Sequence, residues 1–221
     1  MKYLFLALFI AASAVHLYHS WKDDSKKRAW TKPILLLALI GYYLTAMDSL
    51  SLLLLLALAT SWLGDVLLIP KGNVWFTLGG ISFLFSHFLF ISVYIPQIDF
   101  GSVIWWIVIP VAIAYYAVAF RVIFAVRKNT PKPMLAPMYL YLLANSTMNA
   151  FALMQLTSLR SAGACVAYIG ALLFFVSDCT LFLVRYHKKQ DLIFKRHFTV
   201  MLTYLAGEAL ITIGMLMVQN A

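Results

Sequence analysis

The sequence predicts an all-α integral membrane protein, a polytopic bundle of eight transmembrane helices that forms a single domain over residues 1–221. Hydrophobic residues make up 63% of the chain and charged residues only 11%, whereas soluble domains contain about 25% charged residues. The mean hydropathy is +0.88, and apolar segments of about 20 residues, the length that crosses a bilayer, recur along the chain. These observations exclude a water-soluble fold.

Polar turns and prolines separate the apolar segments into individual helices. The segments predict helices near residues 3–20, 33–47, 49–69, 73–95, 102–127, 134–157, 161–184 and 192–218. Pro110 and Pro137 lie inside predicted spans, where neighbouring helices can satisfy the carbonyl groups that a proline frees. The second predicted helix is short and ends near residues 47–49.

The first predicted helix also has features of a cleavable secretory signal. It combines Met1 and Lys2 with an apolar run and the Ala-Ser-Ala triplet at residues 12–14. The basic residues that follow would be an unusual start for an exported mature chain; they are Lys22, Lys26, Lys27 and Arg28. We therefore expect the helix to be retained.

The basic residues indicate topology rather than a nucleic-acid partner, although the net charge is +9. All but two of the 17 lysine and arginine residues lie in or beside the loops after the first, third, fifth and seventh predicted helices; the exceptions are Lys2 and Arg160. Short basic loops stay on the cytoplasmic side of a membrane. We expect the protein to lie in the inner (cytoplasmic) membrane of a bacterium, with both termini on the outer side of that membrane.

Three carboxyl groups, those of Asp65, Asp178 and Glu208, fall inside predicted spans although the chain has only 8 acidic residues. An ionisable side chain at the centre of a spanning helix costs roughly 2.5–3.5 kcal/mol on insertion scales, and such residues usually have a function. The predicted topology places Asp65 about one turn and Asp178 nearly two turns from the cytoplasmic ends of their helices, with Glu208 and His87 deeper. The two aspartates predict a paired-carboxylate site that opens towards the cytoplasmic side.

Polar or small residues recur at helical spacing around these carboxyl groups. The stripes are Ser61 and Asp65; Gly79, Phe83 and His87; Tyr141, Asn145 and Asn149; and Tyr204, Glu208 and Thr212. Lipid cannot satisfy such faces, so we expect them to share one polar interior. The alternative is that they are hydrogen-bonding contacts between helices, worth about 0.6 kcal/mol each. A small residue before each aspartate, near the end of its helix, also suggests a four-plus-four internal repeat.

Short motifs follow one another in order along most of the chain. They are Lys32-Pro33, Ser61-x-x-Gly64-Asp65, Phe76-x-x-Gly79 followed by Phe83 and His87, Pro137-x-x-x-Tyr141 with Met148, Gly170-Ala171-Leu172 with Phe174 and Ser177-Asp178, and Tyr204. In this ordered set the chain resembles the YhhN-type membrane proteins, the family that contains the lysoplasmalogenases. It departs from the family at Glu208, where a glutamine is expected.

The resemblance implies an eight-helix hydrolase that cleaves the vinyl ether bond of a lysoplasmalogen into a fatty aldehyde and glycerophosphoethanolamine or glycerophosphocholine. This chemistry needs an acid that protonates the vinyl carbon and a base that activates water. Because two close carboxyl groups cannot both ionise, Asp65 and Asp178 would divide these roles. The residues expected to bind substrate or support the site are Lys32, Ser61, His87, Tyr141, Asn145, Asn149, Ser177, Tyr204 and Glu208. The phosphate would lie near Lys32, Lys71 or Arg185.

No cofactor and no metal ion is expected, and the expected partners are a lysophospholipid and membrane lipids, with no nucleic acid.

Other interpretations stay open. Acidic residues and prolines inside spans also fit a proton-coupled transporter of a small or lipidic solute. A structural or assembly factor would keep its phenotype when Asp65 and Asp178 become asparagine, and a set of aspartates with His87 could hold zinc. The sequence leaves open which aspartate is the acid, the head group and the oligomeric state.

Overall fold

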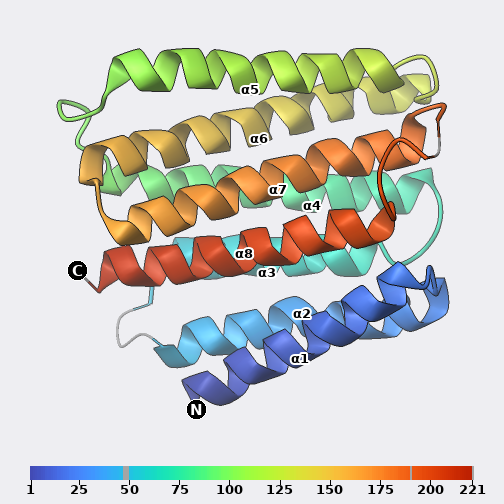
Figure 1. Cartoon of the computed structure of the whole chain (residues 1–221), viewed down its shortest axis with the longest axis horizontal. Helices are drawn as coiled ribbons and strands as arrows, with labels where there is room; N and C mark the ends of the chain where they lie inside the picture. The colour runs from blue at the N-terminus through green and yellow to red at the C-terminus, as the bar shows by residue number, and fades with distance from the viewer. Residues whose placement is uncertain (47–49, 190, 221) are drawn as a thin grey trace. The chain divides into compact units, whose positions relative to one another are not determined.

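The computed structural model describes residues 1–46, 50–189 and 191–220. Within these ranges the chain forms eight α-helices and one short 3₁₀ helix, and no strand (Figure 1). The elements are α1 (Lys2–Trp21), α2 (Ser25–Ala46), α3 (Leu52–Leu67), α4 (Asn73–Tyr94), η1 (Ile95–Gln97), α5 (Trp105–Val126), α6 (Lys132–Leu159), α7 (Ala162–Tyr186) and α8 (His197–Gln219). The predicted all-α class is confirmed.

Six of the described segments are long and apolar enough to cross a membrane. They are α1, α2, α4 together with η1, α5, α7 and α8. α3, with 16 residues, is shorter than a typical spanning helix. α6 has 28 residues but carries buried polar side chains that include Asn145, Ser146, Asn149 and Gln155. A crossing by α3 and α6 therefore stays a prediction.

Two predicted helix starts are wrong. α2 begins at Ser25 instead of residue 33. Its first two turns are polar and basic, so a search for apolar segments does not find them. α8 begins at His197 instead of residue 192, after Lys195 and Arg196, whose φ angles of 46° and 34° are not helical. The predicted end of the second helix and start of the third, near residues 47–49, lie outside the described residues.

Asp24 explains why α2 extends into the polar segment. Its Oδ1 accepts a hydrogen bond from the Lys27 backbone N–H at 3.1 Å, and its carbonyl accepts from the Arg28 N–H at 3.1 Å. An aspartate in this position satisfies an otherwise unpaired N–H and complements the positive end of the helix dipole. The helix consequently starts two turns before Pro33, which lies inside it.

The chain divides into two compact units, residues 1–89 and residues 90–221. The first contains α1, α2, α3 and most of α4, and the second contains the end of α4, η1 and α5 to α8. In the first unit α1 packs mainly on α2, and α2 also packs on α3. A single transmembrane domain over the whole chain stays a prediction.

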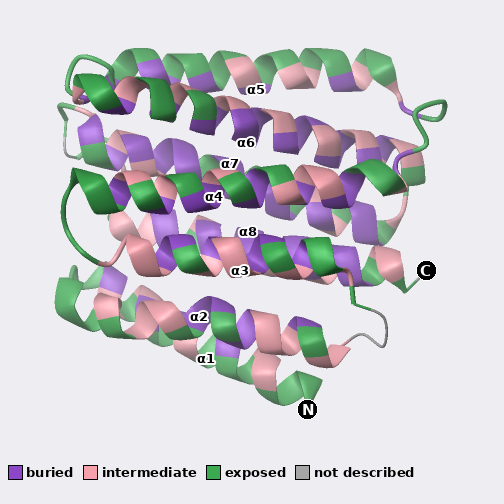
Figure 2. Cartoon of the chain, turned by 180° about the vertical axis from the view of Figure 1, so that it is seen from behind, coloured by how far each residue is buried: buried purple, intermediate pink, exposed green. Residues whose placement is uncertain are grey.

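The second unit is built around the closely packed pair α7 and α8. In the apolar 18-residue stretch of each helix, 56% of the residues of α7 and 61% of those of α8 are buried, against 28% for α5 (Figure 2). Glycines from both helices meet backbone to backbone: a Cβ atom on Gly207 would lie 2.9 Å from the Phe174 nitrogen and 3.0 Å from the Gly170 carbonyl oxygen. Small residues permit this close approach of two helices in a membrane.

We expect Gly207→Ala to destabilise the α7–α8 pair by about 1–3 kcal/mol, because the added methyl group must push two backbones apart. Thermal unfolding in detergent measures the change. Gly80→Ala is the matched control: a Cβ there meets nothing within 4 Å, and alanine is the better helix former by roughly 0.5–1 kcal/mol. Equal melting temperatures for the two variants would contradict the proposed backbone contact.

The hydrogen bond from the Lys27 backbone, with a further contribution from the Lys27 charge, lowers the pKa of Asp24 below its ordinary value of 3.8. A lowered pKa in the folded state stabilises the protein above the unfolded-state value, and this stabilisation is lost as the pH falls through the folded-state value. Melting temperatures measured from about pH 7 to about pH 3 should therefore fall more for the wild type than for Asp24→Asn, which does not titrate there. Parallel pH profiles for the two proteins would refute this role.

Candidate functional site

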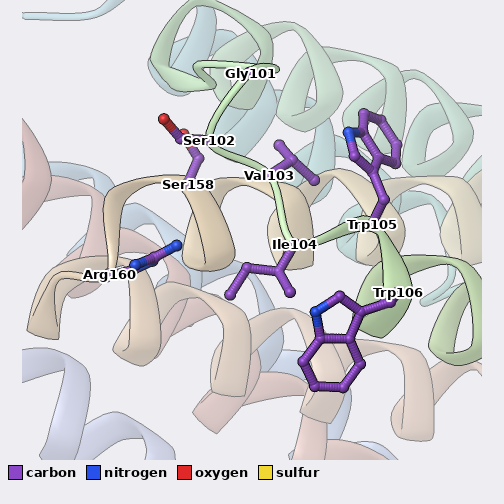
Figure 3. Close-up of a pocket in the computed structure, with 8 residues that line it drawn as sticks. All are labelled: Gly101, Ser102, Val103, Ile104, Trp105, Trp106, Ser158 and Arg160. Carbon is purple, nitrogen blue, oxygen red and sulfur yellow. The ribbon is translucent and has the colours of Figure 1, made fainter.

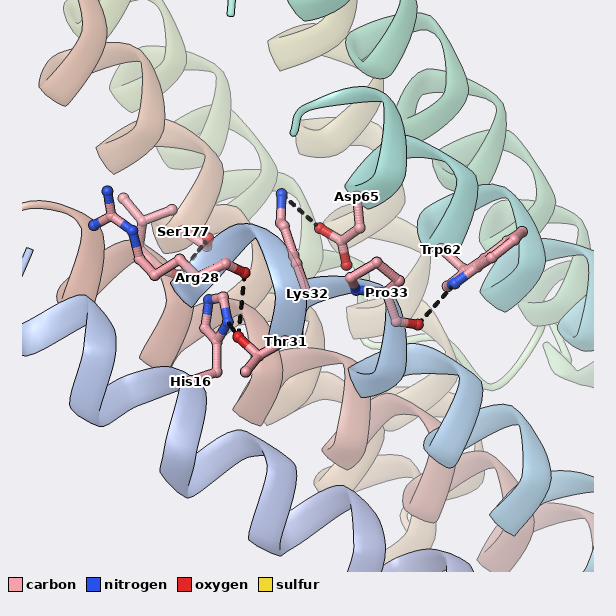
Figure 4. A network of polar contacts seen from close by, with 9 residues as sticks. His16, Arg28, Thr31, Lys32, Pro33, Trp62, Asp65 and Ser177 are labelled. Carbon is pink, nitrogen blue, oxygen red and sulfur yellow. Dashed lines mark hydrogen bonds and ion pairs between the residues drawn. The ribbon is translucent and has the colours of Figure 1, made fainter. Parts of the chain in front are cut away.

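A buried ion pair joins Lys32 of α2 to Asp65 of α3. The Lys32 Nζ lies 3.0 Å from the Asp65 Oδ1, and the two side chains are 14% and 2% exposed (Figure 4). Removing two charges from water is costly unless each compensates the other. Lys32 thus lies against a predicted catalytic carboxylate, and its place near the substrate phosphate stays a prediction.

The first half of α2 is fixed by α3 on one side and by α1 on another. The Trp62 Nε1 donates a hydrogen bond to the Pro33 carbonyl oxygen at 2.9 Å. The His16 Nδ1 lies 2.7 Å from the Thr31 Oγ1, so the residue next to Lys32 is held by α1 (Figure 4). His16, Thr31 and Trp62 were not among the predicted site residues.

Ser61 serves the contact between α3 and α4. Its hydroxyl lies 2.6 Å from that of Ser86, which also lies 3.1 Å from the Ala57 carbonyl oxygen. The shared face of Ser61 and Asp65 was predicted from their spacing, but the Ser61 hydroxyl bonds to α4. His87, one residue further along α4, is fully buried.

Asp178 of α7 is bound by an amide chain from α6. The Asn145 Nδ2 donates to the Asp178 Oδ2 at 2.6 Å, and the Asn149 Nδ2 donates to the Asn145 Oδ1 at 2.9 Å. All three side chains are almost completely buried. Two members of the predicted Tyr141 stripe thus form one network with a predicted catalytic residue.

The remaining predicted residues of the second unit lie in packing contacts. The Ser177 Oγ donates to the Val200 carbonyl oxygen of α8 at 2.9 Å. Tyr141 packs edge-on against Phe182, and Tyr204 against Phe174. Glu208 is fully buried, and its carbonyl oxygen accepts from the Thr212 hydroxyl at 2.8 Å.

The pairing of the two aspartates stays a prediction, because Asp65 belongs to the first unit and Asp178 to the second. The same holds for the single polar interior expected from the four stripes and for the internal repeat. Among the described residues, no group of three or more histidine, cysteine, aspartate or glutamate side chains is arranged to hold a metal ion.

A pocket of about 740 Å³ lies in the second unit at the start of α5 and the end of α6 (Figure 3). Trp105, Trp106, Ser158 and Arg160 contribute to its lining, together with the loop 101–104. Exposed indole rings of this kind are typical of the membrane–water interface. The pocket contains none of the predicted site residues.

A second pocket, of about 300 Å³, is lined by Asn129 and residues 185–188. The Asn129 Nδ2 donates to the Tyr186 carbonyl oxygen at 2.9 Å, and the Arg185 Nε donates to the Tyr186 Oη at 3.0 Å. Arg185, one of the three residues expected near the phosphate, is therefore held in position at the end of the helix that carries Asp178.

The described residues are helical apart from turns and loops, include six helices able to cross a membrane, and bury ionisable side chains among these helices, which is the architecture of a polytopic helical membrane protein. The chain belongs to the YhhN family, whose family model matches residues 27–215. This match confirms the resemblance inferred from the ordered motifs. No curated protein and no solved structure matches the chain.

Replacing only one partner of the Lys32–Asp65 pair should leave a buried charge without its ion-pair partner. We expect Lys32→Met to lower the free energy of unfolding by about 3–5 kcal/mol and the double variant Lys32→Met/Asp65→Leu to regain most of that loss. Denaturant unfolding in detergent measures both. A double variant as unstable as the sum of its two single variants would show that the pair is not coupled.

Proposed function

We propose that the protein is a lysoplasmalogenase, which hydrolyses the vinyl ether bond of an alkenyl-glycerophosphoethanolamine or alkenyl-glycerophosphocholine. Membership of the YhhN family, which is linked to hydrolase activity, supports this proposal. The observation that carries it is that the two buried aspartates have different partners, an ammonium group for Asp65 and an amide for Asp178. Two carboxyl groups in different surroundings can serve as base and acid.

The partners suggest which aspartate has which role. A full positive charge at 3.0 Å favours the carboxylate form of Asp65. Asp65 is then the anion that stabilises positive charge on the substrate and activates water. Asp178, whose Oδ2 accepts from the neutral Asn145 amide, takes the role of general acid in this proposal.

The reaction then proceeds in three steps. Asp178 gives its proton to the vinyl carbon, and the electrons of the double bond leave an oxocarbenium ion at the ether carbon. Water adds to that carbon while Asp65 accepts its proton, forming a hemiacetal. The hemiacetal collapses as its hydroxyl loses a proton and the glycerol oxygen gains one, which releases the aldehyde and the glycerophospho head group.

Arg185 is better placed than Lys32 to bind the phosphate. Lys32 is engaged by Asp65, whereas Arg185 lines a pocket of about 300 Å³. Arg185 follows Asp178 by seven residues, which is about 10 Å along a helix. With the basic loops in the cytoplasm, a phosphate at Arg185 would lie at the inner surface of the membrane and the alkenyl chain would extend between apolar side chains.

The test is release of long-chain aldehyde from a lysoplasmalogen by purified protein in detergent. Wild type should release aldehyde, and both Asp65→Asn and Asp178→Asn should lose about 100-fold or more of the rate, because proton transfer by a positioned group contributes that much. Asp191→Asn, which changes an exposed carboxylate, is the matched control and should retain the wild-type rate. Size exclusion and thermal melts establish that each variant is folded.

Three outcomes would contradict the proposal. Wild type without activity would favour the transporter interpretation and direct the work to solute uptake driven by a proton gradient. Active Asp65→Asn and Asp178→Asn variants would exclude the two aspartates from the chemistry. Equal hydrolysis of acyl lysolipids would indicate a nucleophile and an oxyanion site instead of acid catalysis.

A further inference from the structure

One face of α1 carries three buried polar side chains, at positions 13, 16 and 20. Ser13 is 9% exposed, His16 1% and Ser20 2%. Spacings of three and four residues place them on the side of α1 that packs on α2. The face lies outside the range 27–215 that matches the YhhN family, so family membership says nothing about it.

Thr31 of α2 bonds to one nitrogen of the His16 ring. The Thr31 Oγ1 lies 3.2 and 3.1 Å from the carbonyl oxygens of Lys27 and Arg28, to which it can donate. It also lies 2.7 Å from the His16 Nδ1, and the tautomer of the imidazole decides which of these two atoms donates. In either neutral tautomer the other ring nitrogen, Nε2, is a donor or an acceptor and needs a partner of its own.

None of the described residues supplies that partner. The His16 Nε2 is buried without a hydrogen-bond partner, as are the hydroxyl oxygens of Ser13 and Ser20. Serine and threonine in membrane helices can bond to the carbonyl four residues earlier, as Thr45 does to Gly41 at 2.8 Å. Ser13 and Ser20 do not, and lipid tails offer no substitute.

We propose that Ser13, His16 and Ser20 line a hydrated seam between α1 and α2, and that water is the ligand of this site. Water suits all three groups, because it can donate to or accept from the imidazole nitrogen and the two hydroxyls. From Ser13 to Ser20 the seam covers seven residues, about 10 Å along the helix. Its middle member, His16, bonds to the residue next to Lys32, which pairs with Asp65.

This position gives the seam a role that rests on the proposed function. Hydrolysis of a vinyl ether consumes one water molecule per turnover, and a site inside a membrane must receive it by a polar route. The seam reaches Thr31, and the next residue of α2, Lys32, pairs with Asp65, the residue proposed to activate that water. His16 is thus a positioning residue for the water supply and does not itself touch the reacting atoms.

Cysteine labelling in lipid vesicles tests the seam without reference to activity. On a Cys165→Ala/Cys179→Ala background, Ser13→Cys should react with a charged, water-soluble methanethiosulfonate at least about 10-fold faster than Ala14→Cys, because only a hydrated thiol ionises readily. Ala14 is the matched control, since it lies at the same depth on the exposed side of α1. Equal or slower labelling of Ser13→Cys would overturn the proposal.

A second variant avoids dependence on the folding of the cysteine proteins. Ser13→Ala should lower the melting temperature if its hydroxyl is bound to water. A raised melting temperature would show that the hydroxyl is not hydrated and would overturn the proposed seam.

In the aldehyde assay, His16→Phe should slow release about 10-fold with an unchanged KM, whereas His16→Gln, which keeps a donor and an acceptor, should retain most of the wild-type rate. Failure of the wild type to release aldehyde would remove the proposed function but leave the labelling result to decide the seam.

Discussion

The ion pair between Lys32 and Asp65 is the contact on which the arrangement of the first unit depends. An ammonium group and a carboxylate in apolar surroundings tolerate each other only at contact distance, and theirs is 3.0 Å. The pair therefore requires that Lys32 lie opposite Asp65 along the axes of α2 and α3. The polar first turns of α2, which begin after Asp24, place Lys32 at that position. The bonds of Thr31 and Pro33 to neighbouring helices hold it there.

The second unit solves the same problem with amides. Asn149 donates to Asn145 and Asn145 donates to Asp178, so each member fixes the orientation of the next. Gly170 and Gly207 let α7, the helix that carries Asp178, pack closely on α8. The amide at Asp178 and the ammonium group at Asp65 give the two carboxyl groups different surroundings, and the proposed division into acid and base rests on that difference.

Local sequence pattern predicted the helices and the residues of the Lys32–Asp65 pair and of the Asn149–Asn145–Asp178 chain, but it did not predict which of these residues are bonded to one another. Segment length and hydropathy located most helices because the bilayer imposes a common length. The start of α2 escaped this approach because polar residues 25–31 are helical. Spacing placed Ser61 on the face of Asp65, but the Ser61 hydroxyl bonds to Ser86, since which helix lies opposite a face is decided by long-range packing. The Asn145 stripe was predicted, whereas its partner in α7 was not assigned.

His16 shows most clearly what a sequence cannot provide. A histidine in a first apolar segment has no local pattern that marks it, and the serines three and four positions away are common in membrane helices. Only the structure shows that one ring nitrogen of His16 bonds to Thr31 and that the other is buried without a hydrogen-bond partner among the described residues. His16 bonds to Thr31 of α2, and the next residue of α2, Lys32, pairs with the buried Asp65 carboxylate. One short stretch of α2 therefore contacts both the polar seam and a candidate catalytic group. Lipid supplies neither hydrogen-bonding groups nor counter-charge, so α2 obtains a hydrogen bond from α1 and its counter-charge from α3.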